Sequence, residues 1–263
     1  MALAASSLSL AQVTADSLVN APAVPEQPSG VIGCVVDNPQ GSITSGFLGW
    51  SEGGTHAVLV DPTGTGDPGD PGCAGSFGGQ QFRLSGATFL VADGTAFSSP
   101  NGETGIGTTT YTISVHPLAT PGDPTAGPAA AIESVQQVLN MDASATYNLA
   151  ATLESVVTGP FFVAITFNDF EPNSEVATTL WDGVARPLGR QFADNGSGFV
   201  DHTDFFNNGN LGWVVMSASG DFEPLAGGPL PESQAVNVNS PWAMAILMML
   251  VAGFGLVIVR RAI

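Results

Sequence analysis

Short apolar segments separated by turn clusters constrain the fold of this chain more than any other feature of its sequence. The segments are rich in Val, Ile, Thr and Phe, and pairs such as Pro121-Gly122 and Asn208-Gly209 lie between them. Residues that prefer a pleated, half-buried surface, bounded by Gly, Pro or Asn, are typical of β-strands. The expected strands are Ile32–Val36, His56–Asp61, Gln81–Ala92, Thr108–His116, Ile132–Leu139, Tyr147–Val157, Phe161–Phe167 and Leu211–Ser217.

The spacing of these segments predicts an all-β fold, an antiparallel β-sandwich of the jelly-roll kind. The alternation of strand and helix that builds a parallel sheet is missing from the sequence. Within Tyr111–His116 we expect Ile113 and Val115 on one face, which lies in the core, and Tyr111 and the polar residues on the other. Ala129–Leu139 also carries apolar residues at helical spacing, so one short helix there is an alternative.

The charge balance narrows the classes of partner. The chain has 23 acidic residues against 5 basic ones, a net charge of −18, and every basic residue is an arginine. Nucleic-acid phosphates are bound by clustered basic side chains, so we expect no nucleic acid as partner. Catalysis by a lysine is excluded because the chain has none. The excess carboxylate suits a soluble exported protein and is compatible with a salty habitat, although a lineage bias in composition would produce the same excess.

A membrane-length apolar run lies near the end of the chain, from Trp242 to Val259, and Arg260 and Arg261 follow it. A helix of this length spans roughly 27 Å, close to the thickness of about 30 Å of a bilayer's hydrocarbon layer. We therefore expect a transmembrane helix. The arginine pair orients it by the positive-inside rule, with its C-terminal end in the cytoplasm and residues 1–241 outside.

The residues around this run resemble a bacterial C-terminal sorting signal of the PEP-CTERM group. Such a signal consists of a short motif, a membrane helix and a basic cluster, and this chain is most similar to the IPTL-CTERM form, whose motif reads Ile-Pro-Thr-Leu-Ser-x-Trp. The corresponding residues here are Val236, Asn237, Val238, Asn239, Ser240, Pro241 and Trp242, with the basic pair Arg260 and Arg261. Val236, Ser240 and Trp242 match in position, whereas the three residues after Val236 depart from Pro-Thr-Leu.

The resemblance implies a destination and a partner. In that group an exosortase, a membrane transpeptidase, cuts near the motif and passes the ectodomain to the cell surface or to an exopolysaccharide matrix of a Gram-negative cell. We therefore expect an exported structural protein of the surface or biofilm matrix, and not an enzyme. Its expected partners are the exosortase, the membrane through the C-terminal helix, and an exopolysaccharide. The ectodomain is loosely similar to exported bacterial β-sandwich proteins in Thr158–Ile165 and Leu211–Trp213.

Composition divides the chain into four parts. Residues 1–29 are expected to be the remnant of an export signal and a linker, because Ser9-Leu10-Ala11 before Gln12 has small residues at the positions that precede a cleavage site. Residues 30–225 form the expected β-sandwich ectodomain, residues 226–240 a flexible linker with the sorting motif, and residues 241–263 the membrane helix with its Arg-Arg tail. The Pro- and Gly-rich stretch Thr120–Pro128 is either a loop within one sandwich or a boundary between two smaller domains.

The two cysteines, Cys34 and Cys73, are expected to form a disulfide. An exported chain meets an oxidising environment, and the Gly- and Pro-rich stretch between these residues would gain from a covalent tether. A metal site is the competing interpretation. The CxxC spacing or adjacent histidines that would favour it are missing.

Candidate chemistry elsewhere is sparse, and we predict no catalytic residue. His56, His116 and His202 lie far apart in the sequence, which is typical of isolated strand or surface histidines. The sequence contains no nucleophile-elbow or zinc-protease motif. The acidic, Gly-rich segment with Asp194, Asp201 and Asp204 has the oxygen ligands that Ca²⁺ prefers, although not at EF-hand spacing. Calcium is thus the only cofactor that the sequence suggests.

Two further hypotheses name other residues. One is a calcium- or carbohydrate-binding extracellular module. It would use exposed aromatic rings to stack on sugars, and Trp50, Trp181 and Trp213 are the candidates, unless they belong to the core. An exported hydrolase would need a pair of acids, for instance among Asp169, Glu171 and Glu175.

Overall fold

The structure is a computed structural model of the 263-residue chain. It describes residues 34–37, 42–48, 52–64, 73, 75–93, 106–142, 146–170, 176–182, 188–205 and 213–225. The chain divides into two compact units, Met1–Glu223 and Pro224–Ile263. Apart from Pro224, at the end of the last strand, the described strands belong to the first unit.

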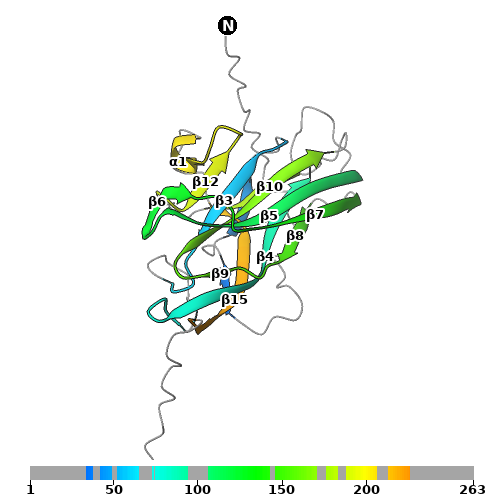
Figure 1. The fold of residues 1–263 in the computed structure, drawn as a ribbon. Helices are drawn as coiled ribbons and strands as arrows, with labels where there is room; N and C mark the ends of the chain where they lie inside the picture. Colours follow the sequence, from blue (N-terminus) through cyan, green and yellow to red (C-terminus); the bar gives the residue numbers. More distant parts are fainter. Residues whose placement is uncertain are drawn as a thin grey trace, which may run out of the picture. The chain divides into compact units, whose positions relative to one another are not determined.

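Two antiparallel sheets make up this unit (Figure 1). Sheet A has the order β1-β15-β4-β11-β14, with β2 against β11 and with β8 and β9 against β4. Its strands are β1 (Cys34–Asp37), β2 (Ser42–Leu48), β4 (Gln80–Asp93), β8 (Thr146–Thr152), β9 (Val156–Val157), β11 (Val176–Asp182), β14 (Trp213–Val214) and β15 (Met216–Pro224).

Sheet B has the order β13-β12-β3-β10-β5-β6, with β7 against β5. Its strands are β3 (Thr55–Val60), β5 (Ile106–Thr120), β6 (Asp123–Pro128), β7 (Glu133–Asp142), β10 (Phe161–Phe170), β12 (Gln191–Asp194) and β13 (Val200–Asp201). A four-residue helix, α1 (His202–Phe205), follows β13. The mostly antiparallel β architecture confirms the all-β prediction, and the jelly-roll arrangement stays a prediction.

The main core lies between the two sheets. It contains most of the largest buried side chains, and the rings of Phe82 from sheet A and Phe161 from sheet B stack with centroids 6.2 Å apart. Ile113 and Val115 belong to this core, as predicted. The expectation for Tyr111 is wrong: it shares their face, because residues two apart in a strand point to the same side. Because each sheet buries one face against the other, the apolar area removed from water holds them together.

A second, smaller core lies on the opposite face of sheet B. Sheet B curls there, so that Gly189 comes against the backbone of Thr125 in β6 and Gly127 comes against the ring of Phe192 in β12. The curl covers a second set of apolar side chains: Ala57, Leu59, Leu118, Phe162, Ala164, Phe192 and Phe199. Burial on both faces explains why β3 and β10 carry nearly continuous apolar runs instead of alternating ones.

The segment with two competing predictions, Ala129–Leu139, is not a helix. Its residues from Glu133 onward belong to β7, which pairs with β5 over ten described registers from Glu133↔Val115 to Asp142↔Ile106. Tertiary pairing decides the outcome: in the extended strand Val135 and Leu139 pack against the main core, whereas Ile132 and Val138 are exposed. The described helix α1 lies elsewhere, where no helix is predicted.

The predicted disulfide between Cys34 and Cys73 is confirmed. The two Cα atoms lie 5.5 Å apart, and the bond ties β1 to the segment that leads into β4. Both sulfur-bearing residues pack against the main core.

Within the described residues, the structure contains no helix long and apolar enough to cross a membrane. The predicted membrane run Trp242–Val259, the sorting motif from Val236 to Trp242 and the pair Arg260-Arg261 lie outside the described residues. The predicted export-signal remnant does so too.

Candidate functional site

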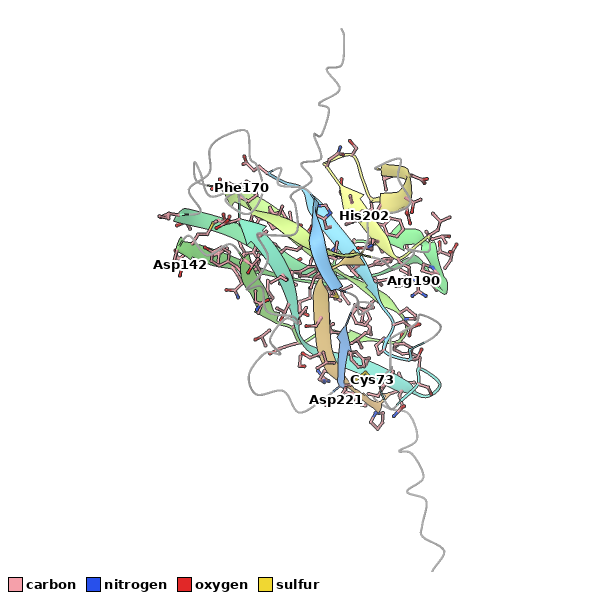
Figure 2. All side chains as sticks on the ribbon, turned by 180° about the vertical axis from the view of Figure 1, so that it is seen from behind. Cys73, Asp142, Phe170, Arg190, His202 and Asp221 are labelled. Atoms are coloured by element: carbon pink, nitrogen blue, oxygen red, sulfur yellow. A yellow bond between two sulfur atoms is a disulfide. The ribbon has the colours of Figure 1, made fainter. Side chains whose placement is uncertain are left out.

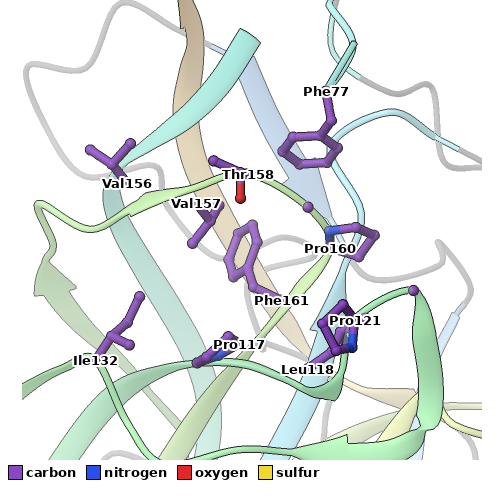
Figure 3. A pocket seen from close by; sticks show the side chains of 12 residues that line it. Phe77, Pro117, Leu118, Pro121, Ile132, Val156, Val157, Thr158, Pro160 and Phe161 are labelled. Carbon is purple, nitrogen blue, oxygen red and sulfur yellow. The ribbon is translucent and has the colours of Figure 1, made fainter. Parts of the chain in front are cut away.

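A largely apolar pocket opens at one end of the sandwich (Figure 3). Its volume is about 490 Å³, within the range of small-molecule sites. The lining comes from the end of β5, the β5–β6 turn, the residue before β7, the stretch from β9 to the first residue of β10, and the segment before β4. The lining residues are Phe77, Pro117, Leu118, Pro121, Gly122, Ile132, Val156, Val157, Thr158, Gly159, Pro160 and Phe161.

Tight turns and prolines shape the walls of this pocket. Pro121 and Gly122 form the turn between β5 and β6, where Gly122 adopts φ +79°, a conformation that a side chain would strain. Pro160 sets the entry into β10, whose first residue, Phe161, closes the floor. Proline rings fix φ and donate no hydrogen bond, so these walls are both stiff and apolar.

The disulfide supports one wall. Cys73 lies four residues before Phe77 in the same loop. The ring of Phe77 packs edge-on against Phe222 of β15, with centroids 5.2 Å apart. Phe222 packs in the same way against Phe82 and contacts Gly75, where a side chain would collide with the ring. The loop carrying Phe77 is therefore held by a covalent bond on one side and by aromatic packing on the other.

The chemistry of the pocket favours binding over catalysis. Among its lining side chains, the hydroxyl of Thr158 is the one hydrogen-bonding group, and none of them is charged or titratable. Acid–base or nucleophilic catalysis uses side chains such as His, Asp, Glu, Cys or Lys, and none of these lines the pocket. A pocket of this character suits an uncharged apolar group.

His116 takes part in a buried polar cluster on β5. Its Nε2 lies 2.8 Å from Oγ of Ser114, and its Nδ1 lies 2.8 Å from the carbonyl oxygen of Ala129. Phe199 packs edge-on against the imidazole. Burial lowers the pKa of His116, and the hydrogen bond to Ala129 opposes that shift.

The Ser114–His116 pair resembles a nucleophile and its base, but both side chains are buried. Neither of them lines the apolar pocket, so a substrate there would not meet them. The alternation predicts an outward polar face for these residues. The curl of sheet B buries that face instead, and the pair serves to satisfy its own hydrogen bonds inside the second core.

His56 and His202 meet although 146 residues separate them in the sequence. Nδ1 of His56 lies 3.3 Å from Nε2 of His202, and the two rings meet edge-on. Both are buried, and burial lowers the pKa of His56 from 6.5 to about 4. The prediction of isolated histidines is therefore wrong for this pair, because pairing of β12 with β3 brings α1 beside β3, and no local pattern announces that contact.

Two of the three predicted calcium residues, Asp194 and Asp201, brace loops. Oδ1 of Asp194 accepts hydrogen bonds from the backbone N–H groups of Gly196 and Gly198, at 2.7 and 2.9 Å. The carboxylate of Asp201 accepts from the N–H groups of Thr203 and Gly189, at 2.8 and 2.7 Å, and Asp204 is exposed. Across the part of the chain that the structure describes, no three His, Cys, Asp or Glu side chains gather in a way that could hold a metal ion. Calcium binding stays a prediction.

The structure describes only some of the tryptophans expected for sugar binding and of the acids expected for a hydrolase. The backbone register pairs Trp181 of β11 with Trp213 of β14, so two of the three tryptophans are cross-strand neighbours, and Trp50 lies outside the described residues. Asp169 is exposed on β10 next to an irregularity in the β10–β5 register. Glu171 and Glu175 lie outside the described residues, and the acid pair stays untested.

Sequence reasoning did not identify the pocket. Its lining comes from five stretches whose common property is apolar character, which equally indicates core. The available signal was the set of prolines at strand ends, Pro117, Pro121 and Pro160, which predicts stiff connections but not that they enclose a space.

Comparison with known proteins gives little further information. No protein-family model matches the chain, and no curated protein matches it. Among solved structures, it is similar to the crystal structure of the cysteine protease and lectin-like domains of Cwp84, a surface layer associated protein of Clostridium difficile, at 16% identity and a TM-score of 0.39. The similarity covers 64% of this chain and 32% of that one, so the chain spans about a third of that structure's length. A likeness this distant supports no statement about function.

Proposed function

We propose that this chain is an exported bacterial protein with a structural role at the cell surface or in the extracellular matrix, delivered by its C-terminal signal. The observation that carries the proposal is the Cys34–Cys73 disulfide. Disulfides form and persist in oxidising compartments outside the cytoplasm. The orientation that Arg260 and Arg261 predict for the apolar run agrees with this compartment, since it leaves both cysteines outside.

The sorting step is tested by the mass of the protein recovered from a native host that has an exosortase. We expect a chain that has lost the run Trp242–Val259. A double variant Ser240→Ala, Trp242→Ala should keep full length, because it removes two positions that match the motif. Ser233→Ala, a matched change upstream of the motif, should be processed normally. Recovery of unaltered chain ending at Ile263 would refute the proposal.

The apolar pocket favours a second role, the binding of an uncharged apolar ligand group. The supporting observation is its volume of about 490 Å³ with a single hydroxyl in the lining. Burying apolar surface supplies roughly 25 cal/mol per Å² and needs no charged partner. The strongly acidic chain would also repel an anionic ligand, which favours a neutral one.

Binding of the neutral fluorescent probe N-phenyl-1-naphthylamine tests this role. Ile132 lines the pocket and is largely exposed, so Ile132→Gln should leave folding intact and weaken probe binding about fivefold, since it removes about 1 kcal/mol of apolar contact. Ile106→Gln changes an equally exposed isoleucine outside the lining and should bind like the unmodified chain. Equal binding by both variants would remove this role.

A further inference from the structure

Within the part of the chain that the structure describes, one strand of sheet B has an edge without a partner strand. β5 turns at Pro121-Gly122 and returns along its own length as β6 and then β7. The first half of this return, β6, lies against the β12 region, where Gly189 meets Thr125. The second half, β7, pairs among the described residues with β5 alone, and it lies beyond β5 at the margin of the sheet (Figure 1).

The β7 edge lacks the devices that usually protect an exposed strand. Natural sheets blunt their edges with charged side chains, proline or bulges, because unpaired N–H and C=O groups are a template for another strand. From Ser134 to Met141 the strand has no charged residue, no proline and no glycine, and its acids, Glu133 and Asp142, stand at its two ends. Val138, near the middle, is 56% exposed.

The neighbouring edge of sheet A has the same character. β8 contacts β7, pairs among the described strands with β4 alone, and contains no charged residue in Thr146–Thr152. One side of the sandwich is therefore bounded by β8 and by the Ser134–Met141 part of β7, which carry no charged residue, in a chain whose net charge is −18. Figure 2 shows Asp142 at the end of β7, on the side of the molecule away from Arg190.

We propose that β7 pairs antiparallel with β7 of a second copy of this chain, around a two-fold axis at Gln137. Charge restricts the place of such a contact, because two copies that each carry −18 repel one another over most of their surface and approach best where charge is missing. The strand is also complementary to itself, as a two-fold contact requires.

The register follows from the two faces of the strand. Val135 and Leu139 are half-buried against the main core, whereas Gln136 and Val138 lie on the exposed outer face. Antiparallel partners that lie opposite share a face, so the two-fold axis must pass through a residue. Centring on Gln137 places Val135 opposite Leu139 of the second copy and continues the main core across the junction. It also places Gln136 opposite Val138. At each end of the junction Glu133 comes next to Asp142 of the second copy, but the two side chains lie on opposite faces of the sheet.

Cysteine crosslinking of the full-length chain in mild detergent tests the register. The described cysteines are both in the disulfide, so a single introduced cysteine supplies the reporting thiol. Directly opposite Cβ atoms in an antiparallel pair lie about 4.5–5.5 Å apart, near disulfide range, whereas diagonal ones lie about 7–8 Å apart. Gln137→Cys should give a disulfide-linked dimer on a non-reducing gel. Gln136→Cys and Val138→Cys should crosslink when mixed, and less when each is alone.

Asn195→Cys is the matched control, because Asn195 is an exposed amide in the β12–β13 turn, remote in sequence from β7. It should give a background level of dimer. If Gln137→Cys crosslinks no more than Asn195→Cys, the proposal is wrong. Crosslinking of Gln137→Cys to a different protein in its native host, without the self-linked dimer, would also overturn it and would point to strand addition by another partner.

Charge variants provide a second measurement that does not depend on a thiol. Gln137→Glu and Gln137→Lys each place like charges opposite each other in the dimer and should each weaken association about two- to fivefold in analytical ultracentrifugation. A 1:1 mixture of the two variants should recover association. If charge acted only through net repulsion, Gln137→Lys would strengthen the dimer, as Asn195→Lys is expected to do, and that result would refute the pairing.

This inference is independent of the sorting signal. Crosslinking reports on β7 whether or not the C-terminal run is removed, and the mass measurement reports on processing whether or not the chain dimerises. Added salt should tighten the dimer, because it screens the repulsion between the two acidic copies. Loosening by salt would mean that ion pairs hold the copies together, which contradicts an uncharged interface.

Discussion

Acidification should destabilise this fold through His56, which is buried in contact with His202. In the folded chain burial lowers the pKa of His56 to about 4, whereas in the unfolded chain the imidazole titrates near 6.5. Between these values the unfolded chain binds a proton that the folded chain does not. Stability is therefore independent of this group above pH 6.5 and falls as the pH drops from 6.5 toward 4.

The magnitude follows from the size of the shift. One pKa unit corresponds to about 1.4 kcal/mol, so a fall from 6.5 to about 4 removes roughly 3 kcal/mol of unfolding free energy across this window. A small folded domain has only about 5–15 kcal/mol in total, so the effect is large enough to measure. Burial lowers the pKa of His116 as well, which adds a loss in the same direction.

Urea unfolding followed by circular dichroism at pH 7, 5.5 and 4 measures the loss. His56→Gln keeps a hydrogen-bonding side chain toward His202 but does not titrate, so the difference between unmodified and variant chains isolates the contribution of His56. We expect the variant to be less stable at pH 7, from imperfect packing, yet to lose about 3 kcal/mol less on acidification. Equal losses in both chains would refute the assignment. His116→Gln is the parallel variant on the other buried histidine.

Three further predictions concern the covalent tether, a loop anchor and the extent of the folded unit. Denatured, unreduced protein should show no maleimide-reactive thiol, and Cys34→Ser with Cys73→Ser should lower stability by about 4 kcal/mol on the loop-entropy estimate for a separation of 39 residues, a loss that an equilibrium melt would show. Glu133 accepts hydrogen bonds from the backbone N–H groups of Glu154 and Ser155, so Glu133→Ala should cost about 2 kcal/mol in a urea melt, and an unchanged midpoint would contradict that role. A chain ending near residue 228 should retain a β-type circular dichroism spectrum and a single unfolding transition, whereas two separated transitions would indicate two domains.

Strands with long apolar runs could be predicted from the sequence, and short strands or strands with proline and glycine could not. Gln81–Ala92 and Phe161–Phe167 match β4 and β10 closely, because long apolar, β-branched runs bounded by turns have few other ways to bury their surface. β6 and β12 escaped prediction, since Asp123–Pro128 contains two prolines and a glycine, and Gln191–Asp194 is too short to show a period. These strands form because the curl of sheet B offers them a partner.

The Cys34–Cys73 pairing needed only the count of cysteines and the compartment that the tail implies, because two cysteines allow a single intramolecular bond. The apolar pocket, the His56–His202 contact and the open edge of β7 depended on which segments the tertiary structure brings together. His56 and His202 are 146 residues apart, and the pocket draws on five separate stretches. The local sequence indicates where a strand forms, through its alternation of apolar and polar residues. Which strand lies beside it depends on long-range pairing, because the free energy gained by burying both cores outweighs local preference.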